Sequence, residues 1–222
     1  MIQGNVVKEN VVKENKAART KDAANKSNIR NLALIAMLAA VATALMLFEI
    51  PLPFLAPPFY ELDFSEVPVL IGTFAMGPLA GIAIEFVKIL LNFVLNGTIT
   101  AGVGEIGNFL IGCSLIVPAG IIYNQKKTKK HAIGGMAVGT VFMAVAGCFI
   151  NAYLLLPAYS TGLGIPMETL VGMGTAINPA IDNVFTFVLF AVGPFNLLKG
   201  IVVSVLTLLL YKRVSILIKA HH

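Results

Sequence analysis

The chain has 222 residues, of which 57% are hydrophobic and 12% charged, and its formal net charge is +5. Soluble domains average about 45–50% apolar and about 25% charged residues, so this composition excludes an ordinary soluble protein. The apolar runs are long and continuous, which excludes a membrane β-barrel and predicts an all-α membrane protein. The basic residues fall in blocks typical of cytoplasmic loops, so we predict a lipid bilayer and no nucleic acid as partner.

The first thirty residues are polar and basic, and the stretch 6–10 repeats without change as 11–15. Such low hydrophobicity predicts a disordered tail, and its lysines and arginines predict that it lies in the cytoplasm. We therefore divide the chain into a polar basic cytoplasmic tail (1–30), a six-helix transmembrane domain (31–213) and a cytoplasmic C-terminal end (214–222).

The first predicted span, Leu32–Ile50, has nineteen residues and carries a stripe of small side chains at Ala36, Ala40 and Ala44. A helix of this length rises about 28 Å, which is just enough to cross the hydrocarbon. Small residues four apart let a second helix approach closely, so the stripe predicts a helix–helix contact. Ordinary packing against the protein's own helices is the alternative.

The next segment, Pro51–Phe64, is predicted to be a stiff loop on the outer side. Its four prolines forbid a helix, and the acids in and beside it have no balancing base. We interpret it as an extracellular lid over a membrane cavity; a set of aromatic belt residues at the interface is the alternative. Its aromatic residues are Phe54, Phe59, Tyr60 and Phe64, and the acids are Glu49, Glu61, Asp63 and Glu66.

A short apolar helix (67–76) follows the lid, with Ser65 as a good N-cap. The chain then turns back at 77–81 into a third span, Ile82–Leu95. Glu85 and Lys88 lie within that span, three residues apart, where each can neutralise the other's charge. We interpret them as a structural ion pair, with a proton or ion relay as the alternative.

Polar side chains gather at the outer ends of the last three predicted spans. Each pair comes from a different helix, and its two members lie close together on that helix. We expect these groups to converge beneath the lid and to form an enclosed binding site with apolar walls. The pairs are Glu105 with Asn108 at the start of the fourth span, Asn151 with Tyr153 at the end of the fifth, and Asn196 with Lys199 at the start of the sixth.

The fifth span (132–156) and the sixth are separated by a long outer loop that is predicted to contain a helix. The apolar stretch from Pro179 to Tyr211 has 33 residues, which is too long for one straight span. We expect an interfacial helix that begins at Asn178–Pro179, then a break near Gly193–Pro194, and then the sixth span.

Charge asymmetry predicts the topology. Six spans place both termini and the basic loop Lys126–Lys130 in the cytoplasm, and the outer loops contain no lysine or arginine. No GxxxxGK[ST], HExxH, CxxC or GxSxG motif occurs, so the sequence predicts neither an enzyme nor a metal site. The prediction is a multi-pass protein of the cell membrane that needs no cofactor.

Four stretches of the chain, 57–68, 104–110, 151–159 and 193–200, carry a resemblance to a known family. Together they resemble the riboflavin-specific substrate-binding (S) components of energy-coupling factor (ECF) vitamin transporters. The resemblance runs from about Asn31 to Arg213, which makes this region the substrate-binding domain.

The resemblance implies a subunit that captures riboflavin outside the cell and delivers it inward. Its implied partners are a transmembrane coupling subunit, which docks on the alanine stripe, and two ATP-binding cassette ATPases. Asn151, Asn196 and Lys199 are implied to hydrogen-bond the flavin while the lid closes over it. Riboflavin is the transported substrate and not a cofactor. The predicted substrate-binding set is Phe59, Tyr60, Leu62, Asp63, Glu105, Asn108, Asn151, Tyr153, Asn196 and Lys199.

Two alternatives for the function stay open at this stage. One is an S component for another vitamin, and the other is a stand-alone transporter in which Glu85 and Lys88 relay protons. Against the second, no inverted repeat of broken helices is evident in the sequence. An intramembrane enzyme would need a nucleophile–base or metal constellation, and the sequence lacks one.

Overall fold

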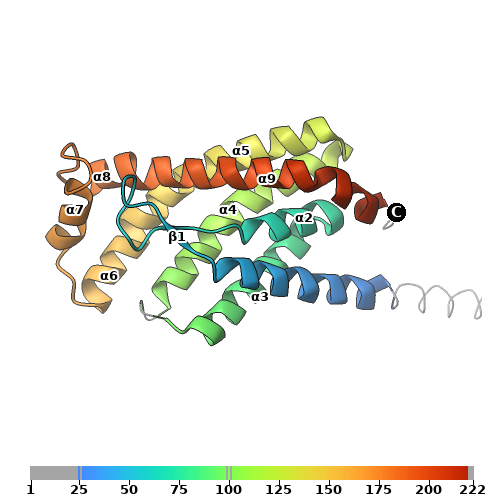
Figure 1. Ribbon diagram of the computed structural model, residues 1–222, viewed down its shortest axis with the longest axis horizontal. Helices are drawn as coiled ribbons and strands as arrows, with labels where there is room; N and C mark the ends of the chain where they lie inside the picture. Colours follow the sequence, from blue (N-terminus) through green and yellow to red (C-terminus); the bar gives the residue numbers. More distant parts are fainter. Residues whose placement is uncertain (1–24, 26, 99, 101, 220–222) are drawn as a thin grey trace, which may run out of the picture.

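The computed structural model describes residues 25, 27–98, 100 and 102–219, with side chains described up to residue 210. Most of the predicted tail (1–30) therefore lies outside the described residues, as do residues 220–222 of the C-terminal end. The helices lie side by side along one long axis, and the described chain begins and ends at the same end of the bundle (Figure 1).

Helices dominate the described residues, and five helical segments are long and apolar enough to cross a membrane. This confirms the prediction of a helical, multi-pass membrane protein. The first segment is Ser27–Met46, and the others are Pro78–Asn96, Val103–Lys126, Lys129–Gly162 and Val184–Leu210. The labelled helices are α2 (Glu66–Met76), α3 (Pro78–Asn96), α4 (Val103–Lys126), α5 (Lys129–Ile150), α6 (Leu156–Gly162), α7 (Met167–Thr175), α8 (Val184–Phe187) and α9 (Gly193–Lys219), with π-helical turns η1 (Asn151–Leu155) and η2 (Val188–Val192).

Helix α2 has 11 residues, fewer than any of the five candidate membrane spans, and returns directly into α3. The two helices join at Gly77, whose φ of 99° favours glycine, and Pro78 begins α3. A helix of this length rises about 16 Å, roughly half the thickness of the hydrocarbon. The α2–α3 hairpin thus places the N-terminal end of α2 inside the bundle, directly after the lid.

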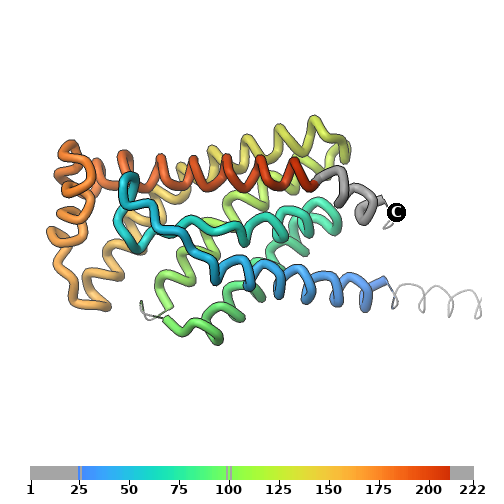
Figure 2. The backbone as a smooth tube through the Cα atoms, in the orientation of Figure 1, coloured from blue at the N-terminus to red at the C-terminus, as the bar shows by residue number. Residues whose placement is uncertain are grey.

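The first helix ends four residues earlier than predicted, at Met46 instead of Ile50. Pro51 restricts the residue before it to extended backbone, and Ile50–Pro51 accordingly forms strand β1. β1 pairs antiparallel with β2 (Glu61–Leu62), so that Ile50 faces Leu62 and Pro51 faces Glu61. The lid is therefore a closed hairpin, which reaches from the first helix toward the start of α9 and returns to α2 (Figure 2).

The predicted break near Gly193–Pro194 is wrong, because the helix runs without interruption from Val184 to Leu210. The π-turn η2 directly precedes Gly193 and Pro194. A π-turn widens the helix by one residue, and this accommodates a ring that has no N–H to donate. The helix also begins later than Asn178–Pro179, at Val184, behind a capping box made by Asn183 and Thr186.

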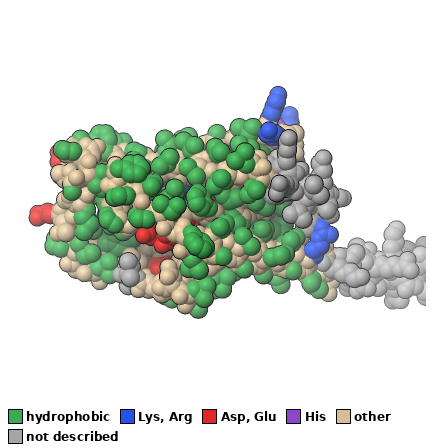
Figure 3. All heavy atoms as spheres, viewed as in Figure 1, with side chains coloured by type: hydrophobic (Ala, Val, Ile, Leu, Met, Phe, Trp, Pro, Cys, Tyr) green, Lys and Arg blue, Asp and Glu red, His purple; other side chains and the backbone are tan. Residues whose placement is uncertain are grey.

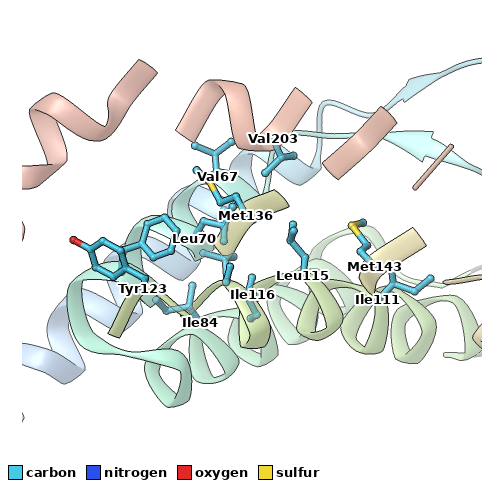
Figure 4. Packing of buried hydrophobic residues seen from close by; sticks show 14 of the residues in the cluster. Val67, Leu70, Ile84, Ile111, Leu115, Ile116, Tyr123, Met136, Met143 and Val203 are labelled. Carbon is cyan, nitrogen blue, oxygen red and sulfur yellow. The ribbon is translucent and has the colours of Figure 1, made fainter. Parts of the chain in front are cut away.

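The apolar core holds the bundle together where α2, α3, α4, α5 and α9 meet (Figure 4). Leu70 of α2, Ile84 of α3 and Leu115 of α4 are fully buried there. A second apolar cluster at the other end includes Phe187 and Phe195. The outer face is also covered by apolar side chains, as expected where lipid surrounds the protein (Figure 3).

Candidate substrate-binding site

The lid hairpin places Tyr60 against the fifth and sixth predicted spans. The Tyr60 hydroxyl donates to Asn151 Oδ1 at 2.5 Å. Its ring centre lies 5.6 Å from that of Phe195 and 6.3 Å from that of Phe187. Phe59 packs beside it, with ring centres 4.7 Å apart. The lid is therefore fastened to the helices by one hydrogen bond and a group of aromatic contacts.

Asp63, near the end of the lid, forms an ion pair with Lys199 of α9. The distance from Lys199 Nζ to Asp63 Oδ2 is 2.7 Å, and the two side chains are 7% and 2% exposed. The other carboxylate oxygen accepts from the backbone N–H of Ser65 at 2.7 Å. Burial alone would raise the pKa of Asp63, but Lys199 and then Lys88 outweigh it and hold this pKa at about 2.

Asn151 and Asn196 lie on facing helices, and each amide bonds to its own helix one turn back. Asn151 Nδ2 donates to the carbonyl of Gly147 at 2.8 Å, and Asn196 Nδ2 donates to that of Val192 at 3.0 Å. A Cβ at Gly147 would lie 2.7 Å from Asn196 Nδ2, so this glycine lets the second amide approach α5. Both asparagines are buried. We call Tyr60, Asp63, Asn151, Asn196 and Lys199 the lid site.

Five predicted substrate-binding residues thus lie together, and the remaining five lie around them or elsewhere. Leu62 is buried in β2, and Phe59 is 37% exposed beside Tyr60. Glu105 accepts from the hydroxyls of Thr98 and Thr100, at 3.1 Å each, and Asn108 is half-buried on the same helix. Tyr153 is 78% exposed and stacks on Phe149, so the structure does not bring it to the lid site.

The alanine stripe lies on the outside of the bundle. Ala36, Ala40 and Ala44 are exposed, whereas Ala39 and Ala42 of the same helix are fully buried. Packing against the protein's own helices therefore uses the other face of this helix.

Two of the four acids in and beside the lid, Asp63 and Glu66, have lysine partners from other helices, contrary to the expectation that these acids have no balancing base. Asp63 has Lys199, and Glu66 lies 2.8 Å from Lys88 Nζ. Glu85 lies 2.7 Å from the same ammonium, which confirms the expected proximity of Glu85 and Lys88 but adds a second acid. Ser65 makes no side-chain cap for α2, because its hydroxyl accepts from Lys88 at 3.2 Å. We call Ser65, Glu66, Glu85 and Lys88 the buried cluster.

Glu49 lies beside the lid hairpin and is half-buried. Burial, a side-chain hydrogen bond with Glu61 and the charges of Glu61 and Asp63 raise its pKa to about 8, although Lys199 opposes the shift. Glu49 is therefore a protonated partner of Glu61 at neutral pH.

Two grooves in the described residues lie away from the lid site. One of about 330 Å³ runs between α3 and α4 and is lined mainly by apolar residues, together with Glu105. The other, of about 290 Å³, lies between α5 and α9. Both are apolar grooves on the outer faces of helix pairs, and neither includes a member of the lid site. In the lid site, Tyr60 instead bonds to Asn151 and Asp63 to Lys199, so residues of the lid occupy the polar groups of the helices.

Several residues of the site could not be found from the sequence. Phe187 and Phe195 stood in apolar runs with no feature to separate them from core residues. Glu66 looked like an outer acid at a helix start, although it is fully buried. The glycine content of α5 was a signal for Gly147, because close helix–helix approach needs such residues.

Comparison with known proteins supplies the family. Residues 30–211 match the model of the ECF transporter substrate-specific component. The chain belongs to this family. The resemblance seen in the sequence is thereby confirmed, and the chain is a transporter component and not an enzyme.

Named relatives match over nearly their whole length. The chain is 36% identical to the riboflavin transporter RibU of Staphylococcus aureus (strain TCH60), covering 88% of this chain and 95% of that one. It is 32% identical to the riboflavin transporter FmnP of Bacillus subtilis (strain 168), covering 82% and 90%. A solved structure of the S component of a bacterial ECF transporter superposes with a TM-score of 0.67 at 36% identity, covering 86% of this chain and 99% of that one.

Proposed function

We propose that this chain binds riboflavin and is the substrate-binding subunit of an ECF-type uptake transporter. The main support is that the chain is 36% and 32% identical to two riboflavin transporters over nearly their entire length. The lid site supports this assignment, because three of its members are the residues for which the family resemblance implies flavin contacts. An S component for another vitamin is the alternative within the same family.

The chemistry of the lid site suits a flat heteroaromatic ring with a hydroxylated tail. Amides such as those of Asn151 and Asn196 can both donate to and accept from ring carbonyls and hydroxyls. Tyr60, Phe59 and Leu62 offer apolar faces for the ring. In this proposal Glu105 and Asn108, near the start of α4, complete the set, whereas Tyr153 is exposed away from the lid site and is left out.

The lid supplies partners that riboflavin would replace. Asp63 holds Lys199, and Tyr60 holds Asn151. A ligand that bonds to Lys199 and Asn151 must first release both contacts, so the lid has to move when the vitamin enters. Exchange of one partner for another keeps the buried groups satisfied before and after binding.

The proposed topology has six spans, with α2 as the short second one, both termini in the cytoplasm and the lid outside. Figure 3 supports it, because lysine and arginine gather at one end of the bundle while acidic side chains lie toward the other end and the middle. The setting is the cell membrane. The exposed alanine stripe would dock the transmembrane coupling subunit, to which two ATP-binding cassette ATPases supply energy.

Riboflavin binding by the purified protein tests the proposal. We expect quenching of riboflavin fluorescence on titration, and we expect Lys199→Met to weaken binding by about 10- to 150-fold, the equivalent of about 1.5–3 kcal/mol for a charge-assisted hydrogen bond. Lys126→Met, at the far end of α4, is the matched control. Absence of quenching, with thiamine or biotin bound instead, would refute riboflavin and leave the family assignment intact.

A further inference from the structure

The buried cluster carries two carboxyl groups and only one ammonium group. Glu66, Glu85 and Lys88 are each 0% exposed, and the cluster lies where α2, α3 and α4 pack together. With every group ionised, the cluster would hold one uncompensated negative charge. An uncompensated charge buried at membrane depth costs several kcal/mol, so such groups normally gain a cation or a proton.

The buried cluster also has fewer hydrogen-bond donors than its carboxylate oxygens need. Among the described residues, Glu66 Oε2 and both oxygens of Glu85 have no hydrogen-bond partner. Glu85 Oε1 lies 2.7 Å from Lys88 Nζ and forms an ion pair with it, but the angles of this contact lie outside those of a hydrogen bond. Lys88 donates to Glu66 Oε1 and to Ser65 instead. A donor for Glu85 is therefore missing from the cluster.

Groups on neighbouring elements do not supply that charge. Lys199 is the other cation within range, and it is already paired with Asp63. Thr43 of the first helix contacts the backbone carbonyl of Lys88, and Cys113 of α4 is a free cysteine that brings no cation. Asn92, one turn along α3, adds another buried oxygen without a partner. The surroundings of the cluster therefore add acceptors and no free cation.

The space around the cluster distinguishes between a metal ion and a proton as the missing cation. Gly112 of α4 packs directly on the cluster, where a Cβ would overlap Glu85 Oε1 and lie 3.0 Å from Glu66 Oε1. A metal ion needs several oxygen ligands around it, and the described residues contain no group of three or more acidic, histidine or cysteine side chains that could hold one. A proton needs only one carboxyl oxygen and no additional volume.

We propose that Glu66 and Glu85 share a single proton, so that the buried cluster is a neutral protonation site within the bundle. One carboxylate balances Lys88, and the other is a carboxylic acid whose O–H supplies the missing donor. Ser65 joins this site to the lid, because its hydroxyl contacts Lys88 while its backbone N–H holds Asp63. The site does not depend on which vitamin the protein binds.

Infrared spectroscopy of the full chain in detergent, in H2O and in D2O, tests the proposal. The parent carries Glu49→Gln, because Glu49 also holds a proton at neutral pH. We expect one carbonyl band of a buried protonated carboxyl, shifted in D2O. Glu85→Gln should abolish it, and Glu66→Gln should abolish it too, because the remaining glutamate then ionises to balance Lys88. Glu168→Gln, at an exposed position of α7, should retain the band.

The parent spectrum decides the matter even if a variant fails to fold. No band in the parent would overturn the proposal, and so would a band of full intensity in either cluster variant. The parent protein could lack the band and gain thermal stability in sodium chloride but not in choline chloride. That result would show that a sodium ion, and not a proton, balances the cluster.

Discussion

The lid site and the buried cluster each pair lysine with acid, but they are built from different parts of the chain. The lid site joins residues 91 and 136 positions apart, across a hairpin and two helices. The buried cluster joins residues 3, 22 and 23 positions apart, nearly all within the α2–α3 hairpin. In the proposed binding step the contacts of the lid site open when the lid moves, whereas those of the buried cluster would open only if two packed helices separated.

This difference assigns the two lysines to different tasks. Lys199 is held by an aspartate on a loop, which can turn toward water and release the ammonium to a ligand. Lys88 is held by glutamates on rigid helices, so its contacts persist through binding. A polar residue at membrane depth can thus serve either exchange or permanent packing, and the mobility of its partner decides which.

The largest effect that separates the two regions concerns stability. We expect Lys88→Met to lower the free energy of unfolding by about 3–5 kcal/mol, because two buried carboxyl groups lose their only cation. Lys199→Met should cost less, since Asp63 can reach water with its loop. Thermal unfolding in detergent measures both, with the exposed Lys126→Met as control. Equal losses for Lys88→Met and Lys199→Met would contradict the distinction.

A smaller effect is expected at the fastening of the lid. Tyr60→Phe keeps the ring on Phe195 but removes the hydroxyl that donates to Asn151. Because this contact has to open when the vitamin enters, loss of one neutral hydrogen bond, about 0.5–1.5 kcal/mol, should speed riboflavin binding by about two- to tenfold. Stopped-flow fluorescence measures this rate. The exposed Tyr153 gives the control, because an equal change in Tyr153→Phe would contradict a specific role for the Tyr60–Asn151 bond.

The smallest effect is a pH dependence at the lid hairpin. In the native protein the pKa of Glu49 is raised to about 8 from its ordinary value of 4.5. Its contribution to stability is therefore complete below about pH 4.5 and is lost as the pH rises to about 8. Glu49→Gln should flatten the fall of the thermal midpoint across this range. A slope equal to that of Glu168→Gln would show that the Glu49–Glu61 contact does not titrate.

Much of the fold could be predicted, because apolar length and charge blocks reflect the bilayer directly. The helical class, the non-helical segment after the first helix and the α2–α3 hairpin follow from Pro51, Gly77 and the continuous apolar runs. The helix through Pro194 could not be predicted, because proline signals a break unless a π-turn precedes it. The start of the last long helix at Val184 could not be predicted either. It depends on the capping box of Asn183 and Thr186, but Asn178–Pro179 nearby also has the pattern of a helix start.

The five members of the lid site could be predicted, but the contacts among them could not, and for a physical reason. Asn151, Asn196 and Lys199 stand out because amides and ammonium groups are rare in apolar helices. The pairing of Asp63 with Lys199 and of Tyr60 with Asn151 could not be predicted, since both loop residues lie far from their partners in the sequence. Glu66 was misjudged because a carboxylate at a helix start is common on surfaces, and only the tertiary contact with Lys88 shows that it is buried.

The two π-turns have a consequence for how this site changes in evolution. η1 begins at Asn151 and η2 ends at Val192, whose carbonyl binds Asn196, so each turn adds one residue beside a functional amide. Deleting a single residue from 188–192 would restore an ordinary helix and rotate Asn196 and Lys199 by about 100° relative to α8. Single-residue insertions and deletions, more than substitutions, can therefore re-aim the polar groups that a relative presents to its substrate.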